Sequence, residues 1–327
     1  MMLFPLSRPR MAISVTNASL TLVTARRKWP IERSGLRVQH IEERPLPGGL
    51  IAPSASAPNV ADVSALAKEV RALMASTGKT ISTRPVALIL PDLCARLALF
   101  RFDAWPSKPV EQEALLRFRF DKELNFGGSL RLVYRAYPAT TGQRRGQTRG
   151  SAGRQVMAVA IRRDILDQYE AAFIEADCLP VQVELSSFCV FDRCRPFLER
   201  ASRHTSDDAF FLHVVPGCFF FLACRNHSPV YLRLKSIRDS KRLHEECLAT
   251  LQFYDDHVQT GVRTPNRLRS LFVIGDETGL ASDVAESNEI RVQPLRWAHV
   301  GVIPNNTRPL DATREARAFP AMSGVRN

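Results

Sequence analysis

The chain has 327 residues, of which 45% are hydrophobic and 24% charged, and its net charge is +12. This length predicts about two domains of roughly 100–200 residues each, and the apolar content is that of a globular protein with a packed core. The positive charge comes mostly from arginines scattered from Arg8 to Arg326. Scattered arginine favours a generally basic surface over the concentrated patch that nucleic-acid binding prefers.

The cysteines and apolar runs predict a soluble, cytoplasmic protein. The seven cysteines include no CxxC pair, and most lie in apolar runs, where a free thiol behaves as a small buried hydrophobe. They indicate a reducing compartment, without a disulfide framework or zinc site. The apolar stretch at the N-terminus is too short for a signal peptide. The longest apolar region, Ala209–Cys224, is interrupted and falls short of the ~20 residues that span a bilayer.

Strands followed by one helix are expected in the first part of the chain. Alternating apolar residues predict strands over Met11–Val15, Ser19–Thr24 and Leu36–Ile41. A link rich in proline, glycine, serine and alanine covers 45–58. We expect Asn59 to cap a helix that runs to about Thr77. Asp62 is placed like a capping-box acid, and Gly78 like the residue that ends the helix.

The middle of the chain alternates strands with helices. Strands are predicted over Val86–Leu90, Ala95–Phe102, Ser129–Tyr137, Gln155–Ile161 and Val181–Leu185. Helices are predicted from Pro109 to about Asn125, over Asp164–Ala176, and from Ser186 onward. The loop Gly142–Arg154 is basic and rich in glycine, and we interpret it as a hairpin tip. Attraction of anionic lipid or nucleic acid by this loop is the alternative.

The last part of the chain begins with two apolar runs. Ala209–Val215 and Cys218–Cys224 are joined at Pro216-Gly217 and followed by Pro229–Leu234, which predicts a tight hairpin of buried central strands. A helix over about 238–257, a strand over Leu268–Ile274 and a short helix near 280–286 are expected next. The polar, irregular sequence from Pro304 predicts a loose tail.

Three segments are similar to one family. Val156–Val190 resembles a strand–helix–strand passage of the PilM family, Pro85–Pro106 its strand–Pro-Asp–strand run, and Glu43–Ile51 its PLPxGxI link. PilM is the cytoplasmic actin-like component of type IV pilus assembly and is related to FtsA and to the cytoplasmic domains of GspL. The resemblance extends patchily over about residues 11–300, and the order and spacing of the segments carry it.

The resemblance implies an α/β, actin-like (ribonuclease-H-like) two-domain fold with an insertion subdomain of the PilM/FtsA type. Residues 11–84 and 180–200 would form the first actin-like subdomain, and 85–179 an inserted, partner-binding subdomain. Residues 207–303 would form a second domain, followed by the tail over 304–327. This second domain is expected to be reduced, because the chain has too few residues after 237 for the small subdomain that covers nucleotide in the family.

The residues at the family's phosphate loops depart from its pattern. Ser14 stands in place of the first loop's aspartate, and Thr16 in place of its glycine. His213 and Val215 replace the acid and the glycine of the second loop, and the adenosine-side Gly-Gly becomes Gly275 followed by an aspartate. No other phosphate-binding motif occurs in the sequence. We therefore expect a pseudo-ATPase that binds no Mg-ATP; an actin-like ATPase with unorthodox loops is the alternative.

No catalytic residue or metal ligand is predicted. His213 lies in an apolar strand, so we interpret it as a core histidine rather than a ligand or a base. The pair His244 and Glu245 lacks the HExxH spacing of a zinc helix, and a solvated helix face explains it better.

The expected insertion carries more apolar side chains than one packed face requires. The candidates for partner binding are Leu97, Leu99, Phe100, Phe102, Phe118 and Phe120. Such an excess is typical of a groove for a partner, and the PilM resemblance implies a groove that takes a short peptide from the inner-membrane protein PilN. The alternative is that these side chains fill the core of the insertion itself.

The function expected from the sequence is a non-catalytic scaffold of a type IV pilus or related secretion machine. It would bind the cytoplasmic tail of a PilN-like protein and lie peripherally at the inner membrane, where its positive charge would suit an anionic surface. Besides the ATPase alternative, the net charge and the basic loop 142–154 motivate a second alternative, a nucleic-acid-binding protein. No nucleic acid is expected as a partner.

Overall fold

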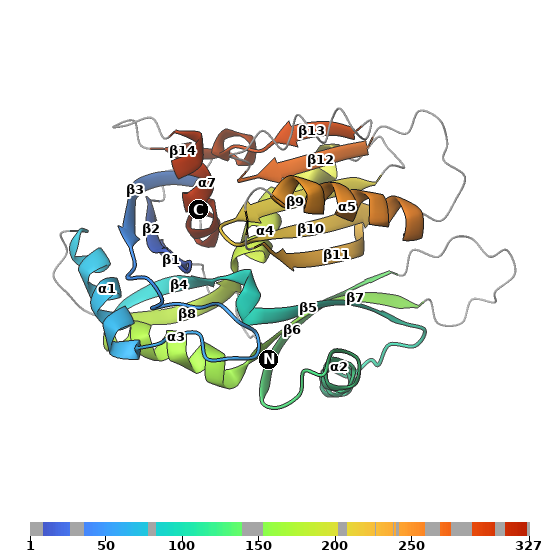
Figure 1. Ribbon diagram of the computed structural model, residues 1–327, viewed down its shortest axis with the longest axis horizontal. Coiled ribbons are helices and arrows are strands. Elements are labelled where there is room, and N and C mark those ends of the chain that lie inside the picture. The colour runs from blue at the N-terminus through green and yellow to red at the C-terminus, as the bar shows by residue number, and fades with distance from the viewer. Residues whose placement is uncertain are drawn as a thin grey trace, which may run out of the picture. The chain divides into compact units, whose positions relative to one another are not determined.

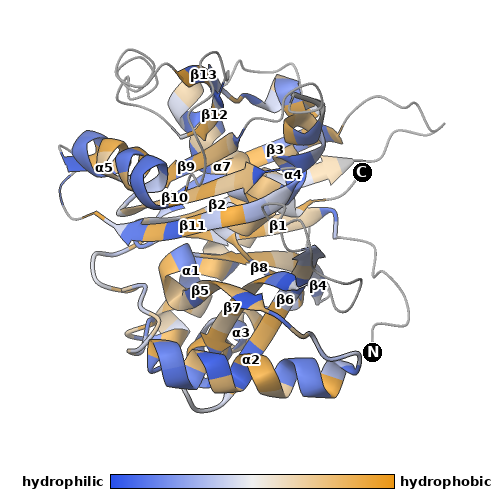
Figure 2. Cartoon of the chain, turned by 90° about the vertical axis from the view of Figure 1, so that its right-hand side faces the viewer, coloured by the Kyte–Doolittle hydropathy of each residue, from blue (hydrophilic) through white to orange (hydrophobic). Residues whose placement is uncertain are grey.

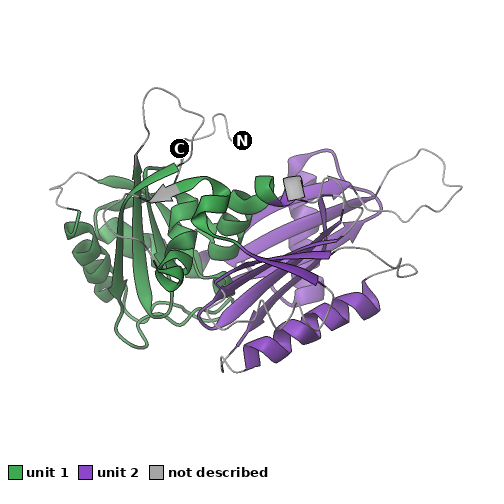
Figure 3. Cartoon of the chain, turned by 90° about the horizontal axis from the view of Figure 1, so that it is seen from above, with its two compact units in different colours: residues 1–94, 164–197, 295–327 green, residues 95–163, 198–294 purple. Residues whose placement is uncertain are grey.

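The computed structural model describes residues 9–26, 36–77, 83–138, 153–201, 208–225, 227–237, 239, 242–258, 269–275, 290–304 and 311–325 (Figure 1). Gly78, most of the loop 142–154 and the short helix expected near 280–286 lie outside these residues. The chain divides into two compact units (Figure 3). Unit 1 comprises residues 1–94, 164–197 and 295–327, and unit 2 comprises 95–163 and 198–294.

Unit 1 is built on a six-stranded sheet of order β14-β3-β2-β1-β4-β8. Its strands are β1 (Met11–Val15), β2 (Ser19–Arg26), β3 (Leu36–Pro45), β4 (Arg84–Leu90), β8 (Cys178–Leu185) and β14 (Val302–Pro304). β1, β2 and β3 form an antiparallel meander, whereas β1, β4 and β8 run parallel. Ile13 and Leu88 are completely buried in this sheet, which explains why its central strands read as almost continuous apolar runs.

In the described residues, unit 1 also contains α-helices and short 3-10 helices. They are α1 (Val63–Ala75), α3 (Arg163–Glu175), α4 (Ser186–Ala201), α7 (Ala312–Gly324), η1 (Asp92–Cys94) and η3 (Trp297–Val300). α4 begins against the buried carboxylate of Asp92, which accepts bonds from the backbone N–H of Ser187 at 2.9 Å and from its hydroxyl at 2.6 Å. Burial raises the pKa of Asp92 to about 6, although both bonds favour its charged form. These contacts fix the end of β4 to the start of α4.

Asn59 has a different role from the one expected. Asp62 is the N-cap of α1, with its side chain accepting from the N–H of Ala65 at 2.9 Å. Asn59 lies three residues earlier, is 1% exposed, and uses its whole amide group in buried hydrogen bonds. Its prediction as a cap was wrong because a short polar side chain before a helix resembles a cap in sequence even when it bonds to groups outside the helix, here in the preceding link and at Cys94 and Tyr169.

The loose tail expected after Pro304 is also wrong. α7 packs against β1, β2 and β4, and Phe319 and Met322 are 1% and 0% exposed. Its first residues are polar and Pro320 lies inside it, which hides the helical pattern because proline normally breaks a helix interior. Gly324 fits closely against the sheet, since a Cβ there would lie 2.8 Å from Ile89 Cδ1.

Unit 2 contains two sheets. A three-stranded sheet of order β5-β7-β6 carries α2 (Pro109–Leu124), and a five-stranded sheet of order β11-β10-β9-β12-β13 carries α5 (Leu243–His257). The strands are β5 (Ala95–Phe102), β6 (Leu130–Pro138), β7 (Arg154–Arg162), β9 (Ala209–Val215), β10 (Cys218–Arg225), β11 (Ser228–Ser236), β12 (Arg269–Ile274) and β13 (Ile290–Pro294). The predicted hairpin of buried strands is confirmed in β9 and β10.

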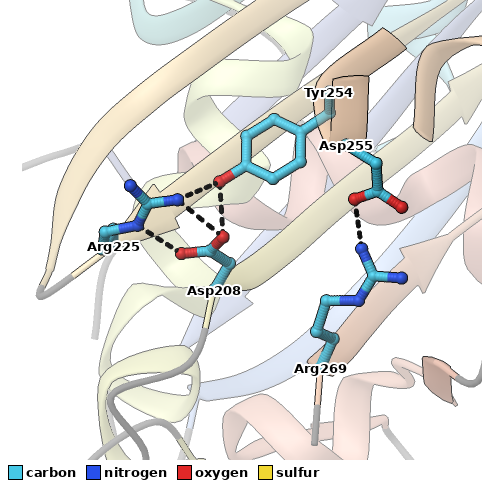
Figure 4. A network of polar contacts seen from close by, with 5 residues as sticks. All are labelled: Asp208, Arg225, Tyr254, Asp255 and Arg269. Atoms are coloured by element: carbon cyan, nitrogen blue, oxygen red, sulfur yellow. Dashed lines mark hydrogen bonds and ion pairs between the residues drawn. The ribbon is translucent and has the colours of Figure 1, made fainter. Parts of the chain in front are cut away.

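A buried ion pair joins three elements of the five-stranded sheet (Figure 4). Asp208 directly precedes β9, is 3% exposed, and accepts two bonds from Arg225 of β10, at 2.7 and 2.9 Å. The hydroxyl of Tyr254 in α5 donates to the same carboxylate at 2.6 Å. Nearby, Arg269 at the start of β12 pairs with Asp255 of α5. These polar contacts fix α5 across the ends of three strands.

The compact units divide the chain differently from the expected domains. β4 and α3, placed in the insertion by the sequence, lie in unit 1, where β4 pairs with β1 on one side and β8 on the other. β14, placed in the second domain, pairs with β3 in unit 1. Of the expected insertion, residues 95–163 lie in unit 2, together with the five-stranded sheet.

We predict that Phe319→Ala lowers the free energy of unfolding by about 3–5 kcal/mol, because it removes a fully buried ring from the contact of α7 with the sheet. Urea denaturation measures this change. Arg317→Ala on the same helix is the matched control and should cost less than about 1 kcal/mol, since Arg317 is half exposed. Equal, small losses in both variants would show that α7 contributes little to the stability of unit 1.

Candidate functional site

The turn between β1 and β2 is held together by hydrogen bonds to the side chain of Thr16. Thr16 Oγ1 accepts the backbone N–H groups of Ala18 at 3.2 Å and Ser19 at 2.9 Å. The N–H of Thr16 donates to the carbonyl of Ser19 at 2.9 Å. Three amides of this turn therefore bind acceptors within the turn itself. Backbone amides of this kind are the groups that cradle phosphate in phosphate-binding loops.

Ser14 lies in β1, just before this turn. It is paired across the sheet with Thr21, and both are 3% exposed. No group in the described part of the chain bonds the Ser14 hydroxyl. A buried serine hydroxyl carries no charge, unlike the carboxylate expected at this place in a magnesium-dependent loop.

The turn between β9 and β10 is a two-residue connection. Val215 pairs with Cys218, which leaves Pro216 and Gly217 as the loop, and Gly217 has φ +85°. Proline followed by a residue with positive φ is the pattern of a type II turn. Pro216 has no N–H to donate, and the carbonyl of Gly217 accepts the N–H of Ile237 at 2.8 Å.

His213 is a core residue, as the sequence indicated. It is 1% exposed in the middle of the sheet, between its β10 partner Phe220 and its β12 partner Ile274. Burial lowers the pKa of its imidazole to about 3. His213 is thus neutral at physiological pH.

Gly275 follows β12 and has φ +86°. A Cβ at this position would lie 2.1 Å from the carbonyl oxygen of Val214 in β9. The glycine is therefore required by the close approach of two backbones, a local reason for its presence that needs no nucleotide.

The six residues predicted to bind a partner do not share one surface. Phe100 and Phe102 point to the α2 side of the three-stranded sheet and are 4% and 6% exposed. Phe120 of α2 is completely buried and meets Phe100 edge-on at 5.3 Å. These three rings form the core of the insertion, the alternative that the sequence left open.

The other three candidates remain at least partly accessible. Because side chains alternate along a strand, Leu97 and Leu99 lie on the face of β5 opposite α2, where both are partly buried. Phe118 projects from α2 and is 60% exposed. Val110 and Leu124, which are not among the six predicted partner residues, are also exposed on this helix. Figure 2 shows hydrophobic and hydrophilic residues interspersed along the visible face of α2.

Comparison with solved structures identifies the architecture. A structure of the PilM–PilN type IV pilus biogenesis complex matches with a TM-score of 0.68, over 97% of this chain and 96% of that chain, at 17% identity. A Bacteroides thetaiotaomicron protein with an actin-like ATPase fold and unknown function matches with a TM-score of 0.50, over 90% and 94%, at 11% identity. This chain has the actin-like fold.

The resemblance to PilM found in the sequence is thus confirmed at the level of the fold. The cytoplasmic domain of EpsL, an inner-membrane component of the Vibrio cholerae type II secretion system, is more distantly similar, with a TM-score of 0.43 at 12% identity over 89% of this chain and 92% of that one. No protein-family model matches the sequence, and no curated protein matches it. Within the described ranges, no helix is long and apolar enough to cross a membrane.

We predict that His213 makes the protein less stable in acid. Below its ordinary pKa of 6.5 the unfolded chain binds a proton that the folded imidazole, with its pKa near 3, does not bind. Stability is therefore lost as pH falls from about 6.5 towards 3. Between pH 6 and pH 5 the wild type should lose about 1 kcal/mol more than His213→Leu, measured by urea denaturation at both values. An identical loss in the two proteins would contradict the burial of a neutral imidazole.

Proposed function

We propose that the protein is a non-catalytic scaffold of a type IV pilus or related secretion machine, which binds the cytoplasmic tail of a PilN-like inner-membrane protein. The observation that carries the proposal is structural similarity over nearly the whole chain to a PilM–PilN complex. A peripheral position at the cytoplasmic face of the inner membrane follows from such a partner. The net charge of +12 suits this position, since basic residues are attracted to anionic lipid.

The two turns support the non-catalytic part of the proposal. Amides that would donate to phosphate instead donate to Thr16 and Ser19, and the second turn contains a proline. Ser14 and the neutral His213 supply no negative charge, whereas magnesium sites use carboxylates. The residues present at these turns do not fit a magnesium–triphosphate group, so no catalytic step is assigned to them.

We predict that millimolar Mg-ATP leaves the melting temperature unchanged relative to magnesium alone. A ligand present at 100 times its dissociation constant stabilises a folded protein by about 2.7 kcal/mol, so binding of ordinary affinity would raise the melting temperature by several degrees. Differential scanning fluorimetry gives the measurement. A saturable rise with nucleotide would instead support the alternative, an actin-like ATPase with unorthodox loops.

We assign the partner's tail to the outer side of α2, where Phe118 exposes most of its ring. Leu97 and Leu99 lie partly covered on the opposite face of the sheet and would not contact a tail bound there. Exposed apolar side chains on a folded protein are typical of an interaction surface. Phe100, Phe102 and Phe120 would act only indirectly, by supporting α2 and β5 from the core.

We predict that Phe118→Ala weakens binding of the host's PilN-like cytoplasmic tail by about tenfold, because burial of a phenyl ring contributes roughly 1.5–3 kcal/mol. Isothermal titration of the purified protein with the synthetic tail peptide measures the affinity. Phe253→Ala is the matched control, since Phe253 is also an exposed phenylalanine, on α5. Equal affinities in both variants would remove α2 from the binding surface, and no binding by the wild type would contradict the proposed partner.

A further inference from the structure

β6 is a long edge strand. It pairs with β7 over all nine of its residues, Leu130–Pro138, without a bulge or register shift. It ends the three-stranded sheet, and within the described part of the chain no strand pairs with its outer side. Edge strands usually avoid new partners by being short, bulged or interrupted by proline, or by carrying charged side chains that repel a like-charged strand. In β6 the only proline is the last residue, Pro138.

The edge of β6 is already open to one donor from outside the sheet. Arg117 of α2 donates from Nη2 to the carbonyl of Leu130 at 2.8 Å. This bond occupies the first carbonyl of the strand and shows that a backbone acceptor of β6 is accessible beside the ladder with β7. On the α2 face, Tyr134 is tied down by a bond to Gln112 Oε1 at 2.9 Å, so the strand is held firmly in place.

The opposite face of β6 has a distinctive alternation. Arg131, Val133 and Arg135 project from it, and all three are exposed, with Val133 at 66%. An exposed β-branched residue between two arginines is suited to cross-strand contact with an apolar residue between two carboxylates. The overall positive charge of the protein would also attract an acidic segment from a distance.

The same alternation opposes pairing with a second copy of this chain. If two copies of β6 paired antiparallel with Val133 opposite Val133, Arg131 of each copy would lie directly opposite Arg135 of the other. The dimer would therefore contain two such pairs of like charges. Like charges directly opposite each other destabilise a pair of strands. The arginines thus select against the homodimer while favouring an acidic strand.

We propose that β6 is a docking edge for an extended acidic segment of a partner protein, which adds a fourth strand to the β5-β7-β6 sheet. The segment would place an apolar side chain opposite Val133 and carboxylates opposite Arg131 and Arg135. Main-chain bonds supply affinity in this mode of recognition, and the alternating side chains supply specificity. This inference is independent of the proposed pilus or secretion role, because it rests only on the geometry and charge of β6.

The test uses a blocked seven-residue peptide of sequence Thr-Glu-Thr-Val-Thr-Glu-Thr and the full-length protein. Three comparison peptides are needed. In the first, both glutamates are replaced by lysine. The other two keep the acidic sequence but carry N-methyl groups on alternate backbone nitrogens, so that each of them blocks the N–H groups along one edge of the peptide strand. We expect the acidic peptide to bind and to slow amide hydrogen exchange in β6. The lysine peptide should bind at least about tenfold more weakly, and one of the methylated peptides should lose binding.

Charge reversal in the protein provides the second arm. The double variant Arg131→Glu and Arg135→Glu should prefer the lysine peptide over the acidic one. Its matched control is Arg96→Glu and Arg101→Glu, which makes the same change of charge at exposed positions of β5 on the other edge of the sheet, and it should keep the preference of the wild type.

Four results would overturn the inference. Equal binding of the acidic peptide and both methylated peptides would reduce the effect to charge attraction without strand addition. Unchanged preference in the Arg131 and Arg135 variant would place the peptide elsewhere, and absence of binding by the wild type would refute the docking edge. A dimer in sedimentation analysis that dissociates in that variant would identify a second copy of this chain as the occupant.

Discussion

The buried amide of Asn59 joins the two places where the chain leaves unit 1 and returns to it. The chain leaves this unit after Cys94 and returns to it at Asp164. Asn59 Oδ1 accepts the thiol of Cys94 at 3.1 Å and the hydroxyl of Tyr169, in α3, at 3.3 Å. Its own N–H donates to Gln168 Oε1 at 2.8 Å. One residue in the link before α1 therefore holds the last residue before the insertion and the first helix after it.

Losing this contact would destabilise unit 1 at the two places where the chain leaves it and returns. Burial raises the pKa of Cys94 to about 12 and also raises that of Tyr169, so both groups stay neutral and act as hydrogen-bonding partners. A buried polar group deprived of its partner costs about 1–3 kcal/mol, and Asn59 is shared by several such groups. The docking edge proposed for β6 and the exposed Phe118 of α2 both lie in residues 95–163, between these two places in the chain.

β1, β4, β9, β10 and β12 are all found close to the expected bounds. These strands could be predicted from the sequence because the inner strands of both large sheets are apolar on both faces. α7 could not be predicted, because only its last two turns are apolar and Pro320 interrupts the pattern. β14 is equally hidden, since a three-residue strand is defined by its pairing with β3, more than two hundred residues earlier. Contacts between distant residues leave no local signal.

For the candidate partner residues of β5, the sequence does contain a local signal, the alternation of side chains along a strand. Strand period alone separates Leu97 and Leu99 from Phe100 and Phe102, because consecutive side chains point to opposite faces. Arg131, Val133 and Arg135 follow the same rule and could have been recognised as one face of a strand. That β6 is an edge strand could not, because strand order depends on which strands pair, and β7 comes between β5 and β6 in the sheet but after both in the chain.

The scattered arginines have at least two roles, which composition could not separate. Two of them stabilise the fold (Figure 4). Arg225, at the end of β10, pairs with Asp208, and Arg269, at the start of β12, pairs with Asp255. Removing one partner of such a buried pair typically costs 3–5 kcal/mol, since the other charge is left uncompensated. Arg131 and Arg135 are exposed, so their contribution to folding is small. This difference in burial separates the arginines that hold the fold together from those on the face of β6 where docking is proposed.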